Sequence, residues 1–378
     1  MFHRAPRIAA GLALTLILAG CSSTATPAPT AVPVTAAPVT AAPVVTPAPA
    51  TPVAIGSVVM IPKQVNNPYF DVAFKGAQNA AKDLGGTVTQ VGPSAADATQ
   101  QIPFIQTATT QKASAILVSA DDATAIAPAL QAAMAAGTKV VGYDSSPAKG
   151  AYNVFVNQAD TAGIGKGLVD MACTEAPSCT GEIAVLSAAQ TATNQNAWIA
   201  AMKTTMSSDT KYANLKLVAT VYGNDDPAIS TTQAQALLSA HPNLKVIVAP
   251  TTVGIVAAAQ VVKAKNLTGK VFVTGLGTPK GMVDFVKGGQ SPVFALWNVT
   301  DLGYLAYAVA VDLINGTIKG TVGEKFTVKF ASGSVDYTIV AGTKADGTPD
   351  AAASVVVLGP PFVFNKDNID SFVTSFGF

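Results

Sequence analysis

Residues 55–84, IGSVVMIPKQVNNPYFDVAFKGAQNAAKDL, decide the fold class. The apolar run Ile55–Ile61 has the length and the Val and Ile content of a buried parallel strand. Apolar residues then recur at helical spacing over Tyr69–Leu84, and Gly85-Gly86 follows where a helix C-cap is expected. The stretch therefore predicts a strand followed directly by a helix.

The same alternation continues along the chain. Strands are predicted at 55–61, 115–118, 139–143, 152–156, 182–187, 215–222, 246–249, 271–274 and 293–297. Helices are predicted at 69–84, 96–112, 122–136, 160–174, 194–208, 227–240, 252–264, 279–287 and 300–315, the third of them capped by Asp121-Asp122. Alternation of this kind predicts an α/β fold with parallel sheets. Because about ten strands exceed one such sheet, we expect two doubly wound, three-layer lobes.

Composition excludes several protein classes. The chain has 378 residues, of which 49% are hydrophobic and 12% charged, and its mean hydropathy is +0.38. No apolar run after the N-terminus approaches the ~20 residues of a membrane-spanning helix, so a polytopic membrane protein is excluded. The net charge of +1 gives no basic excess for nucleic acid, and the two histidines, His3 and His241, are too few for a His-rich metal site. We expect no metal, no cofactor and no nucleic-acid partner.

The N-terminus has the pattern of an export signal. Arg4 and Arg7 precede an apolar segment, Ile8–Leu18, which is too short to span a membrane. Leu18-Ala19-Gly20-Cys21 resembles a bacterial lipobox, which predicts a signal peptide at 1–20 and a lipid on Cys21. The alternative is an ordinary signal peptide that contains a cysteine. Residues 21–53 carry eight prolines and no charge, which is typical of an extended linker.

The two remaining cysteines, Cys173 and Cys179, flank a turn-like segment. In an oxidising exterior they are able to close a small local disulfide, and the alternative is two free thiols. Neither arrangement predicts a reactive thiolate, because no histidine is near in sequence.

Polar and aromatic residues follow the predicted strands. In doubly wound sheets ligands bind beyond the carboxyl ends of the strands, so these residues are expected to meet at one edge of each lobe. The candidate ligand-binding residues are Lys63, Phe70, Asp144, Asn194, Gln195, Pro250, Thr252, Trp297 and Asn298. One cation, one acid, several amides and aromatic faces are the mixture that carbohydrate recognition needs.

Several of these residues have a structural alternative. Asp144 and Asn194 are also plausible helix caps, and Trp297 is also a plausible core residue. Asn67, followed by Pro68, is expected to cap a helix. Asp144 is predicted to be the only acid at the cleft. We therefore do not expect the pair of carboxylates that glycoside hydrolysis requires, and we expect that the chain is not an enzyme.

A family resemblance becomes specific at these residues. Pro62-Lys63 and Asn67–Phe70 look like a general sugar-binding opening. The more diagnostic segments are 155–158, 192–198, 249–254, 274–279, 294–298 and 360–370. Together they resemble the type I periplasmic-binding-protein-like, solute-binding components of bacterial ABC importers, in the subgroup of rhamnose-binding proteins and autoinducer-2 receptors.

The resemblance implies a set of ligand contacts. The autoinducer-2 receptors hold their ligand through a Lys, two Asp, a Gln, a Pro carbonyl and an Ala. The matching residues here are Lys63, Asp144, Asn194, Gln195, Pro250 and Thr252. Asn194 stands where Asp is usual and Thr252 where Ala is usual. Both substitutions are common in the rhamnose-type members, which favours a sugar ligand.

The resemblance also implies the organisation and role of the chain. Residues 54–157 and 299–357 would form lobe 1, and 158–298 and 358–378 lobe 2, with three crossovers forming a hinge. A monomer anchored to the outer face of the cell membrane would capture a rhamnose-type monosaccharide and deliver it to an ABC permease and its ATPase. The alternatives are an autoinducer-2 receptor for uptake or quorum sensing and, less favoured, an exported carbohydrate-active enzyme. A sugar-responsive repressor would need a helix-turn-helix where this chain has an export signal.

Overall fold

The computed structural model describes residues 54–343 and 348–376. The signal peptide, Cys21 and linker predicted for residues 1–53 lie outside the described residues. Among the residues that the structure describes, no helix is long and apolar enough to cross a bilayer.

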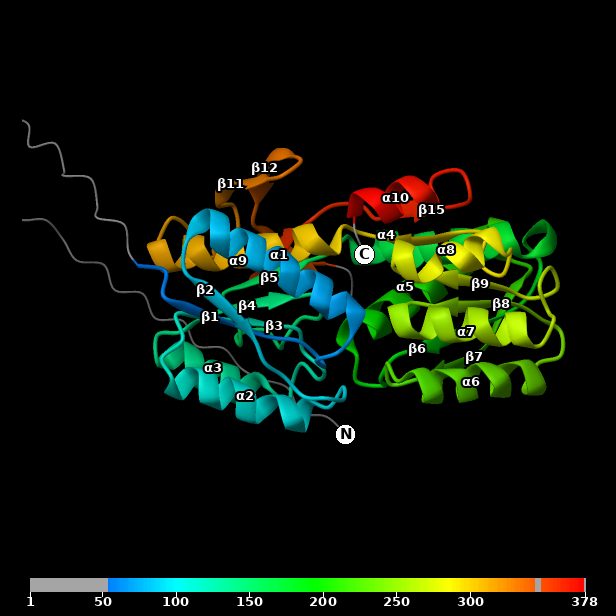
Figure 1. Cartoon of the computed structure of the whole chain (residues 1–378), viewed down its shortest axis with the longest axis horizontal. Helices are drawn as coiled ribbons and strands as arrows, with labels where there is room; N and C mark the ends of the chain where they lie inside the picture. Colours follow the sequence, from blue (N-terminus) through cyan, green and yellow to red (C-terminus); the bar gives the residue numbers. More distant parts are fainter. Residues whose placement is uncertain (1–53, 344–347, 377–378) are drawn as a thin grey trace, which may run out of the picture. The chain divides into compact units, whose positions relative to one another are not determined.

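The first lobe is built around a seven-stranded sheet with the strand order β13-β14-β5-β4-β3-β1-β2 (Figure 1). Its strands are β1 (Ser57–Ile61), β2 (Thr87–Gln90), β3 (Ala115–Val118), β4 (Lys139–Tyr143), β5 (Val154–Asn157), β13 (Val340–Thr343) and β14 (Pro349–Val357). All neighbours pair in parallel except β13, which runs antiparallel to β14.

Alternate residues of β1 enter two different cores. Val58 and Met60 pack in the core shared with α1 (Pro68–Leu84) and α9 (Val299–Asn315). Val59 and Ile61 pack in the core shared with α2 (Ala98–Thr110) and α3 (Ala127–Ala135). Because successive side chains of a strand point to opposite faces, helices must cover both faces of this sheet. Figure 1 shows the three layers, with α1 and α9 on one side and α2 and α3 on the other.

The second lobe is built around a four-stranded parallel sheet with the order β7-β6-β8-β9. Its strands are β6 (Gly181–Ser187), β7 (Leu215–Tyr222), β8 (Leu244–Ala249) and β9 (Phe272–Gly275), and β10 (Phe294–Leu296) pairs with β15 (Phe362–Phe364). Its helices are α4 (Thr161–Glu175), α5 (Thr193–Ser208), α6 (Pro227–Ala240), α7 (Thr252–Ala264), α8 (Pro279–Lys287) and α10 (Ile369–Phe376). The predicted two-lobe α/β fold class is confirmed.

The start of α1 agrees with the prediction, whereas the start of α3 does not. Asn67 accepts a hydrogen bond from the backbone N–H of Tyr69 at 3.0 Å and caps α1, as predicted. The helix predicted over 122–136 instead begins at Ala127. Asp122 accepts from the backbone of Thr124 and Ala125, so it closes a turn before the helix. Asx turns compete with helix caps because the same side-chain oxygen serves both.

Several elements were absent from the sequence prediction. They are β2, β13, β14, β15, α10 and the hairpin formed by β11 (Lys325–Phe330) and β12 (Gly333–Thr338). In β11, Phe326, Val328 and Phe330 alternate with exposed residues and pack in the same hydrophobic core as the buried residues of α9. The alternation is a half-buried strand pattern.

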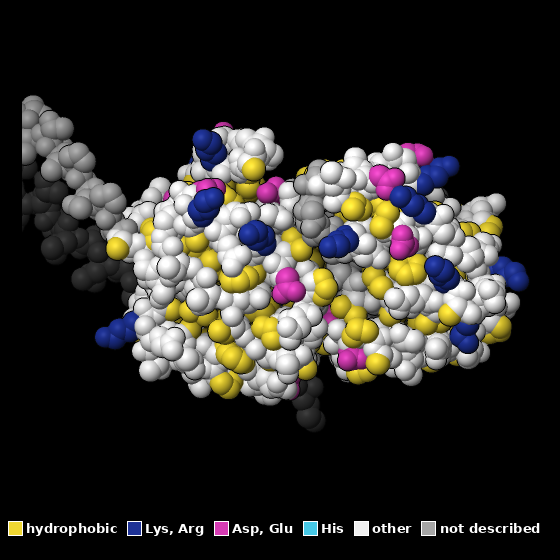
Figure 2. Space-filling model, in the orientation of Figure 1, with side chains coloured by type: hydrophobic (Ala, Val, Ile, Leu, Met, Phe, Trp, Pro, Cys, Tyr) yellow, Lys and Arg dark blue, Asp and Glu magenta, His cyan; other side chains and the backbone are white. Residues whose placement is uncertain are grey.

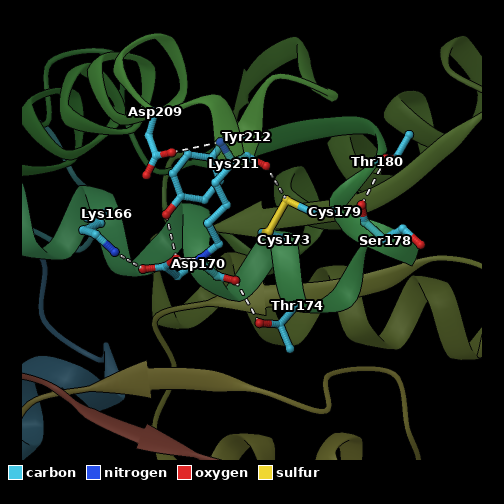
Figure 3. The surroundings of a disulfide bond; sticks show 10 residues. All are labelled: Lys166, Asp170, Cys173, Thr174, Ser178, Cys179, Thr180, Asp209, Lys211 and Tyr212. Carbon is cyan, nitrogen blue, oxygen red and sulfur yellow. Dashed lines mark hydrogen bonds and ion pairs between the residues drawn. A yellow bond between two sulfur atoms is a disulfide. The ribbon is translucent and has the colours of Figure 1, made fainter.

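Cys173 of α4 and Cys179 form a disulfide (Figure 3). One turn earlier in α4, Asp170 accepts from Lys166 at 2.5 Å, Lys211 at 2.6 Å and Tyr212 at 2.7 Å. Partial burial raises the pKa of Asp170, but the three hydrogen bonds outweigh it and lower the pKa to about 2. The carboxylate therefore ties α4 to residues 210–212, beside the disulfide.

Helices α1 and α9 pack closely because glycines lie at their contact. A Cβ on Gly303 would lie 1.8 Å from the carbonyl oxygen of Ala73, and one on Gly76 would lie 1.9 Å from that of Thr300. These are backbone atoms, so a side chain at either position would force the helices apart.

We expect Gly303→Ala to lower the free energy of unfolding by roughly 3 kcal/mol, because overpacking moves a whole helix. Gly167→Ala is the matched control, since Gly167 lies inside α4 with nothing within 4 Å of its would-be Cβ. Alanine there should stabilise the protein by about 0.5–1 kcal/mol through helix propensity. Urea unfolding of both variants checks this, and equal stability of the two would contradict the close packing.

Candidate functional site

A small cavity lies where the strand ends of the two lobes meet. Its volume is about 40 Å³. Eight of the nine predicted ligand-binding residues line it, namely Lys63, Phe70, Asp144, Asn194, Gln195, Pro250, Thr252 and Trp297. The sequence did not single out the other lining residues as ligand-binding: Asn67, Tyr69, Trp198, Asp225, Thr251, Leu276 and Leu296.

Lys63 is a buried cation in the lining of this cavity. On the face shown in Figure 2, charged side chains are scattered among uncharged ones. Lys63, in contrast, is only 4% exposed, just beyond the end of β1. Its Nζ donates to Asn194 Oδ1 at 3.1 Å and lies 3.7 Å from Asp144 Oδ2. A buried ammonium needs such partners, because its desolvation is costly.

Asp144 follows β4 in a left-handed conformation, with a φ of 59°. Its carboxylate accepts from Ser119 Oγ at 2.7 Å, Tyr69 OH at 3.1 Å and Asn194 Nδ2 at 3.2 Å. The next element along the chain is β5, so Asp144 begins no helix and the capping alternative is wrong. The left-handed turn instead points a charged acceptor at Lys63.

Tyr69 connects Asp144 to the second lobe. The indole Nε1 of Trp297 donates to Tyr69 OH at 3.0 Å, and that hydroxyl donates onward to Asp144. Burial and then the charge of Asp144 raise the pKa of Tyr69 well above its ordinary value. The hydroxyl therefore keeps its proton and remains a donor to the carboxylate.

Asn194 and Gln195 lie in the first turn of α5, but neither caps it, because the cap position is Ala192. Gln195 Oε1 accepts from Ser187 Oγ at 2.6 Å and from the backbone N–H of Ala188 at 2.7 Å. Gln195 thus fixes the turn after β6, and that turn presents Asn194 to Lys63.

Asn298 is the one predicted residue outside the cavity lining. Its side chain accepts from the backbone N–H of Asp301 at 3.2 Å and donates to the Asp301 carboxylate at 2.7 Å. It therefore caps α9. A residue that follows a strand and precedes a helix is able to serve either element, and here the helix uses it.

The prediction that Asp144 is the only acid at the cleft is wrong. Asp225 also lines the cavity and is 8% exposed. It accepts a hydrogen bond from Thr251 Oγ1, and burial raises its pKa. The signal was present in the sequence, because Gly223–Asp226 directly follows a predicted strand. Applying the strand-end rule to that strand as well would have found Asp225.

The aromatic lining comes from both lobes. Trp198 of α5 and Trp297 lie with ring centroids 5.9 Å apart, and they are the two tryptophans of the chain. Tyr69 meets Trp297 edge-to-face at 6.2 Å. Trp297 is 2% exposed, so it belongs to the core and to the cavity wall at once. Aromatic faces beside polar groups suit a ligand with both C–H and O–H surfaces.

The sequence profile of the periplasmic binding protein domain matches residues 58–318. The chain belongs to the periplasmic binding protein family. Members of this family are the solute-binding proteins of transport systems and act outside the cytoplasm. It is not a family of enzymes.

Three solved structures illustrate the similarity. An ABC transporter solute binding protein from Clostridium phytofermentas with bound L-rhamnose is 39% identical, with a TM-score of 0.79 over 86% of this chain and 99% of the other. A sugar ABC transporter protein from Actinomyces odontolyticus is 42% identical, with a TM-score of 0.66 over 84% and 97%. An LsrB protein from Clostridium saccharobutylicum in complex with AI-2 is 28% identical, with a TM-score of 0.76 over 84% and 99%.

We expect Tyr69→Phe to destabilise the protein by roughly 1–3 kcal/mol, because it leaves the Trp297 N–H without its acceptor and Asp144 without one donor. Tyr304→Phe is the matched control, since the Tyr304 hydroxyl makes a half-buried bond to Asp83 at 3.2 Å. Its loss should cost below about 1 kcal/mol. Urea unfolding measures both, and an equal loss in the two variants would contradict the role of Tyr69.

Proposed function

We propose that this chain is the extracytoplasmic solute-binding protein of an ABC importer, and that it captures a small sugar of the rhamnose type. The observation that carries the proposal is the cavity between the two lobes, which is lined by the buried Lys63, Asp144 and Trp297 and by the half-buried Asn194. The 39% identity to a protein with bound L-rhamnose supports the ligand class.

The lining residues suit a polyhydroxy ligand. Carboxylate and amide groups of Asp144, Asn194 and Asn67 are able to pair with hydroxyls, and Lys63 is able to donate to a ring or carbonyl oxygen. Trp198 and Trp297 offer apolar faces for C–H surfaces. The proposed ligand contacts are Lys63, Phe70, Asp144, Asn194, Gln195, Pro250, Thr252 and Trp297, with Asn298 supporting them through α9.

Ligand entry requires opening of the two lobes. Lys63, Asp144 and Trp297 line the cavity and are each at most 4% exposed, so a solute cannot reach them from outside while the lobes are closed. The chain passes between the lobes after β5, after β10 and after β14. We propose that segments near Gln158, Val299 and Leu358 form the hinge between lobe 1 (54–157 and 299–357) and lobe 2 (158–298 and 358–378). Ligand contacts with both lobes would then favour the closed state.

Autoinducer-2 is the alternative ligand, for uptake or for quorum sensing. The structure in complex with AI-2 supports it, at the lower identity of 28%. Asn194 and Thr252 favour the sugar, because they replace the Asp and Ala of the autoinducer-2 receptors. An amide donates as well as accepts, whereas an ionised carboxylate only accepts.

The same proposal includes the cellular setting. A lipid on Cys21 would hold the protein at the outer face of the cell membrane, with residues 21–53 as the linker. The closed monomer would dock on a membrane permease that is driven by its ATPase. This keeps the captured solute close to the importer.

We expect the full chain, purified in detergent, to bind L-rhamnose or a related monosaccharide in calorimetric titration. Asp144→Asn should weaken binding roughly 10- to 100-fold, since a charge-assisted acceptor is lost while the shape is kept. Asp226→Asn is the control, because Asp226 caps α6 outside the cavity and Asn caps equally well. Binding of amino acids or nucleosides in place of every sugar tested and of autoinducer-2 would overturn the proposal.

The double variant Asn194→Asp, Thr252→Ala tests the choice of ligand. It restores the pair of the autoinducer-2 receptors, so the affinity for autoinducer-2 relative to L-rhamnose should rise at least about tenfold. Thr252→Ala alone controls for the added space. An unchanged ratio in the double variant would show that other residues set the preference.

A further inference from the structure

A buried carboxylate lies next to the cavity without being part of its lining. Asp121 follows β3 and is 2% exposed. Its backbone N–H donates to Gln101 Oε1 at 3.0 Å, but both of its carboxylate oxygens lack a hydrogen-bond partner. A buried, unpartnered carboxylate is unfavourable when ionised and much less so when it carries a proton.

The charges around Asp121 come from both lobes. Lys63, beyond β1, attracts its negative charge, and the backbone of Asp97 also favours the charged form. The carboxylates of Asp225, beyond β7, and of Asp97, the cap of α2, repel it. Its neighbour Asp122 is occupied with the backbone of Thr124. The same Lys63 already pairs with Asp144 at 3.7 Å. One ammonium therefore faces three buried carboxylates, those of Asp121, Asp144 and Asp225.

Asp225 approaches this cluster from the second lobe. The Gln64 side chain of the first lobe donates to the backbone oxygen of Asp225 at 3.2 Å. Around this contact, a crevice of about 500 Å³ is lined by Gln64 and Asp97 on one side and by Asn224 and Asp225 on the other. Opening of the lobes would withdraw Asp225 and would let water reach the cluster. The repulsion between Asp225 and Asp121 thus belongs to the closed arrangement.

Burial raises the pKa of Asp121 to about 8, although the charge of Lys63 lowers it, and the charges of Asp225 and Asp97 add to the rise. A carboxyl whose pKa is raised by closure binds a proton more tightly in the closed state than in the open state. Closure is then favoured at low pH, and this advantage is lost as the pH rises toward 8.

We propose that Asp121 couples closure of the cleft to uptake of a proton, so that ligand is held more tightly in acidic surroundings and released as they become alkaline. The inference rests on the proposed function, because closure around a solute is the step that it regulates.

A metal cation is a weaker candidate than a proton for neutralising the carboxylate of Asp121. Within the described residues, no group of three or more His, Cys, Asp or Glu side chains is arranged to hold a metal ion.

Calorimetry of the full chain in two buffers of different ionisation enthalpy counts the protons taken up on binding. The probe is L-rhamnose, or the tightest ligand of the titration series. We expect uptake of roughly one proton at pH 7 and a dissociation constant that rises about tenfold or more from pH 6 to pH 8. Asp121→Asn should abolish both effects, and the matched control Asp122→Asn, which keeps the Asx turn, should retain them.

Tryptophan emission tests the coupling without ligand, because both tryptophans of the chain line the cavity. From pH 6 to pH 9 the emission of the native chain should shift to longer wavelength as the cleft opens, and that of Asp121→Asn should not. A pH-independent emission, or the native shift in Asp121→Asn, overturns the proposal even if no solute binds. Failure of every ligand to bind, with the shift intact, would overturn only the proposed function.

Discussion

The burial of Lys63 beside Asp144 is the constraint on which the site depends. Removing either charge from water costs several kcal/mol, and the attraction between them across 3.7 Å does not offset this without further hydrogen bonds. Ser119 and Tyr69 supply such bonds to Asp144 from within the first lobe. Asn194 supplies the remaining one from the second lobe, and it bonds both members of the pair. The pair is therefore fully satisfied only while the lobes meet.

In the proposed mechanism, the Asn194 amide holds the place that a ligand hydroxyl would take. A hydroxyl that enters between Lys63 and Asp144 offers a donor and an acceptor, which are the two roles that Asn194 fills in the closed structure. Such a ligand can replace the interlobe bonds without leaving a buried charge unpaired. Trp297 also takes part in both, because its N–H donates to the hydroxyl of Tyr69 in the first lobe and its ring lines the cavity. In the proposed mechanism, the same few contacts would therefore drive both binding and closure.

The sequence predicted most of the residues that line the cavity, because the topology of a parallel sheet brings them together. Parallel strands place their carboxyl ends at one edge, so Lys63 and Asp144 were predicted to meet although 81 positions separate them. The roles within that edge were not predictable. Asn298 and Asn194 both lie where a strand is followed by the start of a helix, yet the first caps its helix and the second reaches the cavity. The hydroxyl of Tyr69 was missed, because only the packing of Trp297 and Asp144 gives it a role.

The charge balance of the cleft also limits what it can hold. Lys63 is the one cation among the described residues that line the cavity, whereas Asp144 and Asp225 are both in the lining and Asp121 lies close to it. A carboxylate or phosphate ligand would add a negative charge to a buried site whose one lysine is already paired with Asp144, at a large electrostatic cost. An uncharged polyol adds hydrogen-bonding groups and no charge. The electrostatics therefore favour a neutral solute independently of any resemblance, and they do so in a body whose charged residues are only 12% of the chain.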